Sequence, residues 1–140
     1  MAVSLAPEKD RFPVGQKPRV FLAIKNLTEL RFEVSTDNPM RVCVKGKDGD
    51  PPETDYQRHL HGDFRAGDGP DLLPGPVVRN AILPWYPTIL KIDLSAYYDL
   101  SVPGTYTVYT EFMDQTRSRV GEGSWIRTNT AKFEIQGPAR

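Results

Sequence analysis

The sequence predicts an all-β protein built as an antiparallel β-sandwich of about seven strands. Short runs of alternating apolar and polar residues recur along the chain, and turn-rich loops separate them. No segment has the apolar periodicity of a long helix. The chain also contains 13 prolines, which suit loops and edge strands because each proline lacks a backbone donor. Short strands with frequent Gly and Pro turns are typical of sandwiches.

Size and composition indicate one domain over residues 1–140. A chain of 140 residues buries roughly 70% of its unfolded surface, so one core can stabilise it. Hydrophobic residues make up 39% and charged residues 26%, which excludes a charge-driven disordered chain. Residues 46–80 interrupt the strand pattern, and we expect them to form a long irregular insertion.

The expected strands share alternation bounded by turn residues. In the second strand, Val20, Leu22 and Ile24 share one face, while Phe21 and Ala23 lie on the other. Both faces are therefore apolar, as in a central strand. In order, the strands are expected over Val3–Pro7, Arg19–Leu27, Leu30–Val34, Arg41–Lys45, Thr88–Leu94, a run that begins at Tyr106, and Ser124–Gln136.

Two short stretches are predicted to be ordered without being strands. A structureless segment as long as 46–80 is unusual in a compact domain, and Arg58–His61 is the candidate for an ordered piece within it. Residues 93–99 are predicted to make a helical turn, which Asp93 or Ser95 is able to cap.

A tight corner precedes the strand that begins at Tyr106. Asp99 and the Pro103–Gly104 pair mark the turn, and Tyr106 and Val108 open the alternation. A tyrosine at such a corner folds over it and hydrogen-bonds to upstream backbone. Asp99, Gly104 and Tyr106 are therefore assigned to a structural corner that carries no chemistry.

Four stretches of the chain resemble bacterial immunoglobulin-like accessory domains. They are Lys25–Thr28, Ile92–Leu100, Pro103–Val108 and Arg127–Phe133. Similar domains accompany secreted peptidases and other cell-surface proteins, and related sandwiches occur among intracellular proteinase inhibitors. The resemblance covers residues 3–27 and 88–136 and implies an immunoglobulin-like fold. It supplies no catalytic residue.

Charge and hydropathy exclude several partners. Lys plus Arg equals Asp plus Glu, at 18 each, so we expect no basic face for nucleic acid. No polybasic run is present to hold an anionic membrane. The longest apolar stretch, Ala81–Leu90, is too short to span a bilayer and contains two prolines. No leader is recognisable at Met1, so the compartment stays open, and an extracytoplasmic or secreted location is favoured if a leader was removed.

The single cysteine, Cys43, permits no intrachain disulfide. It lies in the expected strand Arg41–Lys45. Free cysteine is among the most buried residue types, so we expect an inert thiol in the core.

The most aromatic loop is the best candidate for a binding site. Trp85 and Tyr86 lie in it, and Trp125 is the other tryptophan. Exposed aromatic rings provide stacking faces for sugars or hot spots for protein partners. Alternatively, Trp85 and Tyr86 plug the end of the sandwich under the long loop.

Other chemistry is weakly indicated. His59 and His61 have a spacing that suits a shared metal with Asp55 or Asp63, but no third histidine and no second cysteine exist. The acidic loop residues lack the spacing of a calcium loop. No nucleophile elbow, dinucleotide fingerprint or phosphate loop occurs. We therefore expect no cofactor and no enzymatic activity.

The sequence thus favours a non-catalytic binding or assembly module. Exposed sheet edges accept strands from other chains, and a terminal segment such as Ala2–Leu5 is suited to donation. The expected partner is another protein or a second copy. Two alternatives stay open: a carbohydrate-binding module that uses Trp85, Tyr86 and Trp125, and a proteinase inhibitor that offers a loop within 46–80.

Overall fold

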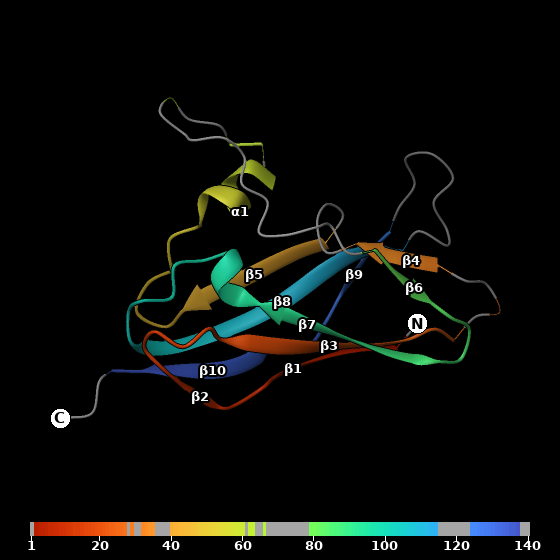
Figure 1. Ribbon diagram of the computed structural model, residues 1–140, viewed down its shortest axis with the longest axis horizontal. Coiled ribbons are helices and arrows are strands. Elements are labelled where there is room, and N and C mark those ends of the chain that lie inside the picture. The colour runs from red at the N-terminus through yellow and green to blue at the C-terminus, as the bar shows by residue number, and fades with distance from the viewer. Residues whose placement is uncertain are drawn as a thin grey trace.

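A computed structural model describes residues 2–27, 29, 32–35, 40–60, 62–63, 66, 79–114 and 124–137, with only the backbone of 32–35, 79–82, 113–114 and 124. The protein is mostly β, as the sequence predicts (Figure 1). One short α-helix and one 3₁₀ turn accompany the strands in the described part of the chain.

The strands form two larger sheets and one small one. The three-stranded sheet has the order β1-β3-β7, with β1 (Ala2–Pro7), β3 (Arg19–Lys25) and β7 (Pro87–Asp93). The larger sheet has the order β2-β10-β8-β5, with β2 (Arg11–Pro13), β10 (Ala131–Gln136), β8 (Gly104–Asp114) and β5 (Met40–Gly46), and β9 (Ser124–Arg127) also pairs with β8. The small sheet pairs β4 (Phe32–Ser35) with β6 (Arg79–Ile82).

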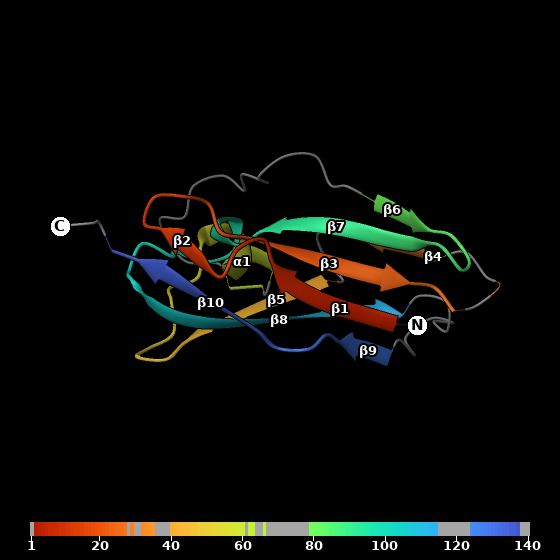
Figure 2. The same cartoon turned by 90° about the horizontal axis from the view of Figure 1, so that it is seen from below.

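The two larger sheets face each other, and the core lies between them (Figure 2). The predicted alternation of β3 is confirmed, because Val20, Leu22 and Ile24 are buried. The facing sheet contributes aromatic rings such as Phe112 and Phe133. Burial of these apolar faces is the main stabilising contribution to the fold.

The strand pattern differs from the expected one in number and direction. The described residues form ten strands rather than about seven. β2 and β6 have three and four residues, too few to show a recognisable alternation. The expected strand Ser124–Gln136 divides into β9 and β10. At this break the Thr128 N–H donates to the Thr110 carbonyl (2.9 Å), and the Thr110 N–H donates to the Thr128 hydroxyl (3.0 Å). In addition, β2 pairs with β10 in parallel, whereas the sequence predicts only antiparallel pairs.

Both predicted ordered pieces are helical. Helix α1 (Asp55–Leu60) contains most of the Arg58–His61 candidate. The 3₁₀ turn η1 (Leu94–Ala96) is capped by Asp93, whose carboxylate accepts the Ser95 N–H at 2.9 Å. Asp93, and not Ser95, is therefore the cap. No helix in the described ranges is long and apolar enough to cross a membrane.

The expectation of a buried Cys43 thiol is wrong. In β5, Val42 and Val44 point into the core, with 0% and 3% exposure. Successive side chains along a strand point to opposite faces of the sheet. Cys43 therefore lies half-buried on the outer face, opposite Tyr109 of β8.

Candidate binding surface

The corner before β8 is buried and hydrogen-bonded. The Tyr106 hydroxyl donates to the Val102 carbonyl oxygen at 2.6 Å, and the side chain is 5% exposed. Its ring stacks on Phe133 with centroids 5.7 Å apart. The Asp99 carboxylate accepts the Ser101 N–H at 3.1 Å. This is the contact pattern that the sequence predicts for a structural corner.

Two further features support the structural role of the corner. Gly104 begins β8 with φ +156°, a conformation that side chains with a Cβ rarely adopt. Burial, and secondarily the negative charge of Asp99, raise the pKa of the Tyr106 hydroxyl above its ordinary value. The corner therefore keeps the Tyr106 hydroxyl protonated and its ring closely packed, which is a structural role.

A pocket of about 210 Å³ opens beside the corner, and residues 46–52 form its other wall. Asp48, Asp50 and Asp99 contribute to its lining. Gly46 has no room for a side chain, since a Cβ there would lie 2.0 Å from the Gly49 carbonyl oxygen. No group of three His, Cys, Asp or Glu residues able to hold a metal ion occurs within the described ranges.

The weak histidine candidate for a metal site is not assembled by the described residues. His59 lies in α1, where it forms part of the basic last turn. His61 lies outside the described residues. Most of the loop proposed for a proteinase inhibitor, beyond residue 60, also lies outside them.

The turn between β6 and β7, residues 83–86, exposes its aromatic residues. Trp85 is 57% exposed and Tyr86 is 68% exposed. The Trp85 N–H donates to the Asn26 carbonyl at 2.7 Å, and the Tyr86 N–H donates to the Leu83 carbonyl at 3.3 Å. The turn is therefore tied to the end of β3, and the interpretation of these rings as a buried plug is wrong.

The backbone of Trp85 is strained. Its φ is +61°, and it is the one residue other than glycine with a positive φ in the described part of the chain. Bulky side chains rarely adopt this left-handed conformation, and such outliers cluster at functional sites. The hydrogen bond to Asn26 helps to hold Trp85 in this conformation, and the side chain stays exposed.

Three further apolar side chains are exposed at this end of the three-stranded sheet. With the two aromatic residues they make up what we name the turn patch, which consists of Leu27, Leu83, Trp85, Tyr86 and Ile89. Exposed apolar groups that gather in one place mark interaction surfaces more often than scattered ones do. The turn patch is therefore the candidate binding surface.

Trp125 does not belong to the turn patch. It lies half-buried on β9, in the other sheet, and the Arg41 guanidinium covers its ring at 4.0 Å from the centroid. Nearby, Arg127 lies over Tyr109 at 4.4 Å and pairs with Glu111 at 2.9 Å. The sequence analysis missed this arginine–aromatic cluster, because only the strand register brings β5, β8 and β9 together there.

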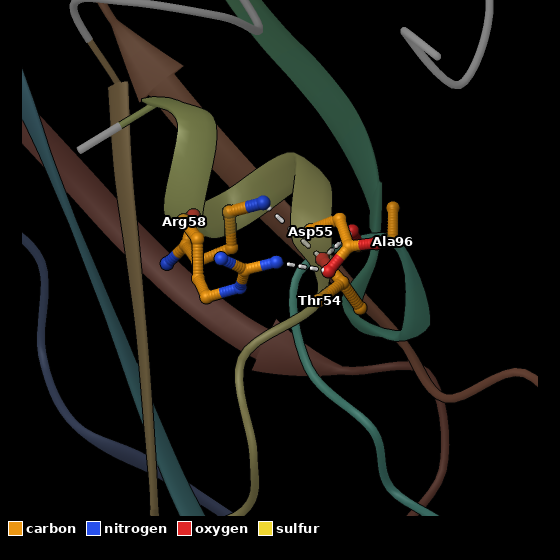
Figure 3. Close-up of polar contacts among 5 residues, drawn as sticks. Thr54, Asp55, Arg58 and Ala96 are labelled. Carbon is orange, nitrogen blue, oxygen red and sulfur yellow. Dashed lines mark hydrogen bonds and ion pairs between the residues drawn. The ribbon is translucent and has the colours of Figure 1, made fainter. Parts of the chain in front are cut away.

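Polar contacts anchor α1 to η1, as Figure 3 shows. The Thr54 hydroxyl donates to the Ala96 carbonyl at 2.7 Å and accepts the Gln57 N–H at 3.2 Å. Arg58 is buried and forms an ion pair with Asp55. These contacts fix the helix against the rest of the fold.

Two sheet edges are closed by side chains from elsewhere in the chain. Gln57 of α1 and Tyr98 both donate to the Val42 carbonyl of β5, at 2.9 Å and 3.2 Å. Asn129 accepts the Leu5 N–H of β1 at 2.8 Å and donates to its carbonyl at 3.0 Å. These contacts occupy outward backbone groups of one residue on each edge strand and hinder pairing with another chain there.

The terminal segment Ala2–Leu5, expected as a strand for donation, is already paired. It belongs to β1, which pairs with β3 along six residues, and Leu5 is buried. Donation would break these contacts within the chain.

No protein-family model matches this chain, and no curated protein matches its sequence. The turn patch, the closed edges and the corner are therefore the features from which a function is inferred.

Proposed function

We propose that this protein is a non-catalytic binding module on an immunoglobulin-like β-sandwich, and that it contacts a protein partner through the turn patch. The topology supports the scaffold. The sheet β1-β3-β7 and the sheet β2-β10-β8-β5, to which β9 also belongs, together contain eight strands, and the first two strands lie in different sheets. The tyrosine corner before β8 is a further hallmark of such domains.

The exposure of Trp85 and Tyr86 on a fixed turn is the observation that carries the proposed function. Aromatic residues dominate the binding energy of protein interfaces, especially where their positions are set before binding. The hydrogen bond from Trp85 to Asn26 supplies this fixed position. The formal net charge of zero does little to oppose association.

The test compares a double variant, Trp85→Ala with Tyr86→Ala, with the unchanged protein. Association is measured by light scattering at micromolar concentration and by affinity capture from the source cells. We expect the double variant to lose the association. Val102→Ala is the matched control, because Val102 is 61% exposed and belongs to the loop between η1 and β8. The start of β8 and the turn between β6 and β7 lie at opposite ends of the molecule (Figure 1). A monomeric chain without any partner, or equal capture by the double variant, contradicts the proposal.

Carbohydrate binding is the second candidate, because the exposed rings of Trp85 and Tyr86 also offer stacking faces. The position of Trp125 under Arg41, in the other sheet, weakens the original three-residue platform. Glycan-array binding that disappears in Trp85→Ala, with the circular dichroism spectrum unchanged, supports this function. Inhibition of a serine, cysteine or metallopeptidase in a panel would instead support the proteinase-inhibitor alternative.

A further inference from the structure

We infer that the outer edge of β7 binds an extended segment of a partner protein, in which an acidic residue lies two positions from an apolar one. This inference rests on the proposed function and specifies its partner. It depends on which backbone groups of β7 point away from β3, and the hydrogen bonds of the three-stranded sheet determine this.

The direction of the backbone N–H and carbonyl groups can be traced across the sheet from β1. Asn129 binds both the N–H and the carbonyl of Leu5, so these groups point away from β3. Leu5 lies opposite Leu22. Residues along an antiparallel strand direct their backbone groups alternately to either side. The backbone groups of Leu22 therefore point away from β1 and toward β7.

The same alternation of backbone groups continues into β7. Leu22 lies opposite Leu90, so the backbone groups of Leu90 point toward β3. The Leu94 N–H donates to the Pro18 carbonyl at 2.9 Å, which is the same phase four residues later. The N–H and carbonyl groups of Ile89 and Lys91 consequently point outward. No backbone hydrogen bond from the described residues reaches them.

This edge differs from the edges of β1 and β5, which side chains close. An edge with unpaired backbone groups accepts an added strand, whose main chain provides affinity while alternate side-chain positions provide specificity. Pro87 lacks an N–H at one end of β7, and Asp93 caps η1 at the other. Among the described residues, the part of this edge without backbone partners therefore centres on Ile89 and Lys91, beside the turn patch.

The side chains along this edge define the chemistry of the occupant. Ile89 is 68% exposed on the outer face. Lys91 lies on the same face, and its ammonium is 5.9 Å from the Phe21 ring centroid. Neither Lys91 nor the nearby Lys25 has an ion-pair partner among the described residues, whereas Arg19 is paired with Glu8 at 3.1 Å. Opposite charges across strands are favourable, so an acidic residue suits the position opposite Lys91, and an apolar residue suits the position opposite Ile89.

The test uses a blocked peptide, Thr-Thr-Thr-Glu-Thr-Ile-Thr-Thr-Thr, with amide hydrogen exchange of the full chain as the readout. We expect the peptide to slow exchange at Ile89 and Lys91, while Leu90 and Ile92 stay unchanged because they already pair with β3. Lys91→Glu should weaken binding of this peptide about two- to fivefold and favour the peptide with Lys in place of Glu. No slowing at Ile89 and Lys91 at millimolar peptide overturns the inference.

A matched pair of variants tests the backbone contact itself. Ile89→Pro removes an N–H that the fold does not use, and proline is tolerated at sheet edges. We expect it to abolish peptide binding with the circular dichroism spectrum retained. Ile89→Thr keeps the N–H and loses only the apolar side-chain contact, so it should weaken binding without abolishing it. Equal binding by both variants overturns the inference.

Two outcomes separate this inference from the proposed function. If the Trp85→Ala, Tyr86→Ala variant loses its partner while Ile89→Pro retains it, the turn patch binds and the edge does not. If exchange at Ile89 and Lys91 slows with protein concentration alone, a second copy occupies the edge, which overturns the acidic segment as its occupant.

Discussion

The two ends of the molecule differ in whether they bury or expose an aromatic side chain. At the corner before β8, Tyr106 is 5% exposed, stacks on Phe133 and donates to the Val102 carbonyl. At the turn before β7, Trp85 is 57% exposed and its φ is +61°. Both turns are held by short hydrogen bonds, but only the corner buries its ring.

This difference separates a residue that stabilises the fold from one that does not. Burial of a large aromatic ring accounts for Tyr106 without any ligand. Trp85 instead adopts an unfavourable left-handed backbone conformation, and more than half of its surface stays exposed. Strain that the fold does not require is a reason to infer function at that place, and the proposed binding surface lies there.

The largest expected effect is the loss of stability in Tyr106→Ala. We expect its free energy of unfolding to fall by about 3–5 kcal/mol, because a large buried ring is replaced by a cavity. Tyr106→Phe should cost about 1 kcal/mol, since only the hydroxyl contact is lost. Chemical denaturation measures both values.

Trp85→Ala is the comparison at the other end. We expect it to change the free energy of unfolding by less than about 0.5 kcal/mol, as is usual for exposed positions. A loss of unfolding free energy as large as that of Tyr106→Ala would show that Trp85 also stabilises the fold, and the contrast between the two ends would fail.

A second prediction concerns alkaline pH. Burial raises the pKa of Tyr106 in the folded state above the unfolded value near 10. Its contribution is therefore complete below pH 10 and is lost as pH rises through the folded-state pKa, because the unfolded chain releases the proton first. The free energy of unfolding should fall by up to about 1.4 kcal/mol per pH unit for this one proton.

Urea denaturation at a series of pH values checks this prediction. Burial also raises the pKa of Tyr98, so Tyr106→Phe should reduce the decline with pH without removing it. Equal declines in the unchanged protein and in Tyr106→Phe would mean that the corner hydroxyl does not resist ionisation.

Local patterns in the sequence predicted the parts of the fold that depend on neighbouring residues. Alternation grouped Val20, Leu22 and Ile24 on one face of β3, which is the buried face, and the Pro103–Gly104 pair located the corner of Tyr106. The expectation of a buried Cys43 came from the usual burial of free cysteine. The alternation of β5 itself places Cys43 on the outer face, between Arg41 and Lys45.

Contacts between distant residues could not be predicted in this way. Asn129 closes the β1 edge at Leu5, 124 positions away. Gln57 closes the β5 edge from a helix in the long insertion. The exposure of Trp85 likewise depends on how the turn is tied to Asn26, and no local pattern specifies that contact. The candidate residues Trp85 and Tyr86 were found from composition, but their separation from Trp125 required the sheet order.

One expected effect has the opposite sign and tests the strain at the turn directly. Glycine adopts φ near +60° without a steric penalty, whereas other residues pay roughly 1–2 kcal/mol. The greater freedom of glycine in the unfolded chain offsets part of this gain. Trp85→Gly should therefore raise the free energy of unfolding by about 0.5–1 kcal/mol while it removes the ring proposed to bind.

Trp85→Asn is the matched control, because asparagine tolerates the left-handed conformation better than most residues. We expect it to lie between Trp85→Ala and Trp85→Gly in stability and, like both, to lose association. A stability gain joined to a loss of binding means that the chain keeps a strained tryptophan at this turn for the contact it makes. A destabilised Trp85→Gly would instead mean that the exposed ring contributes to folding, and Trp85 would then resemble Tyr106 at the opposite end.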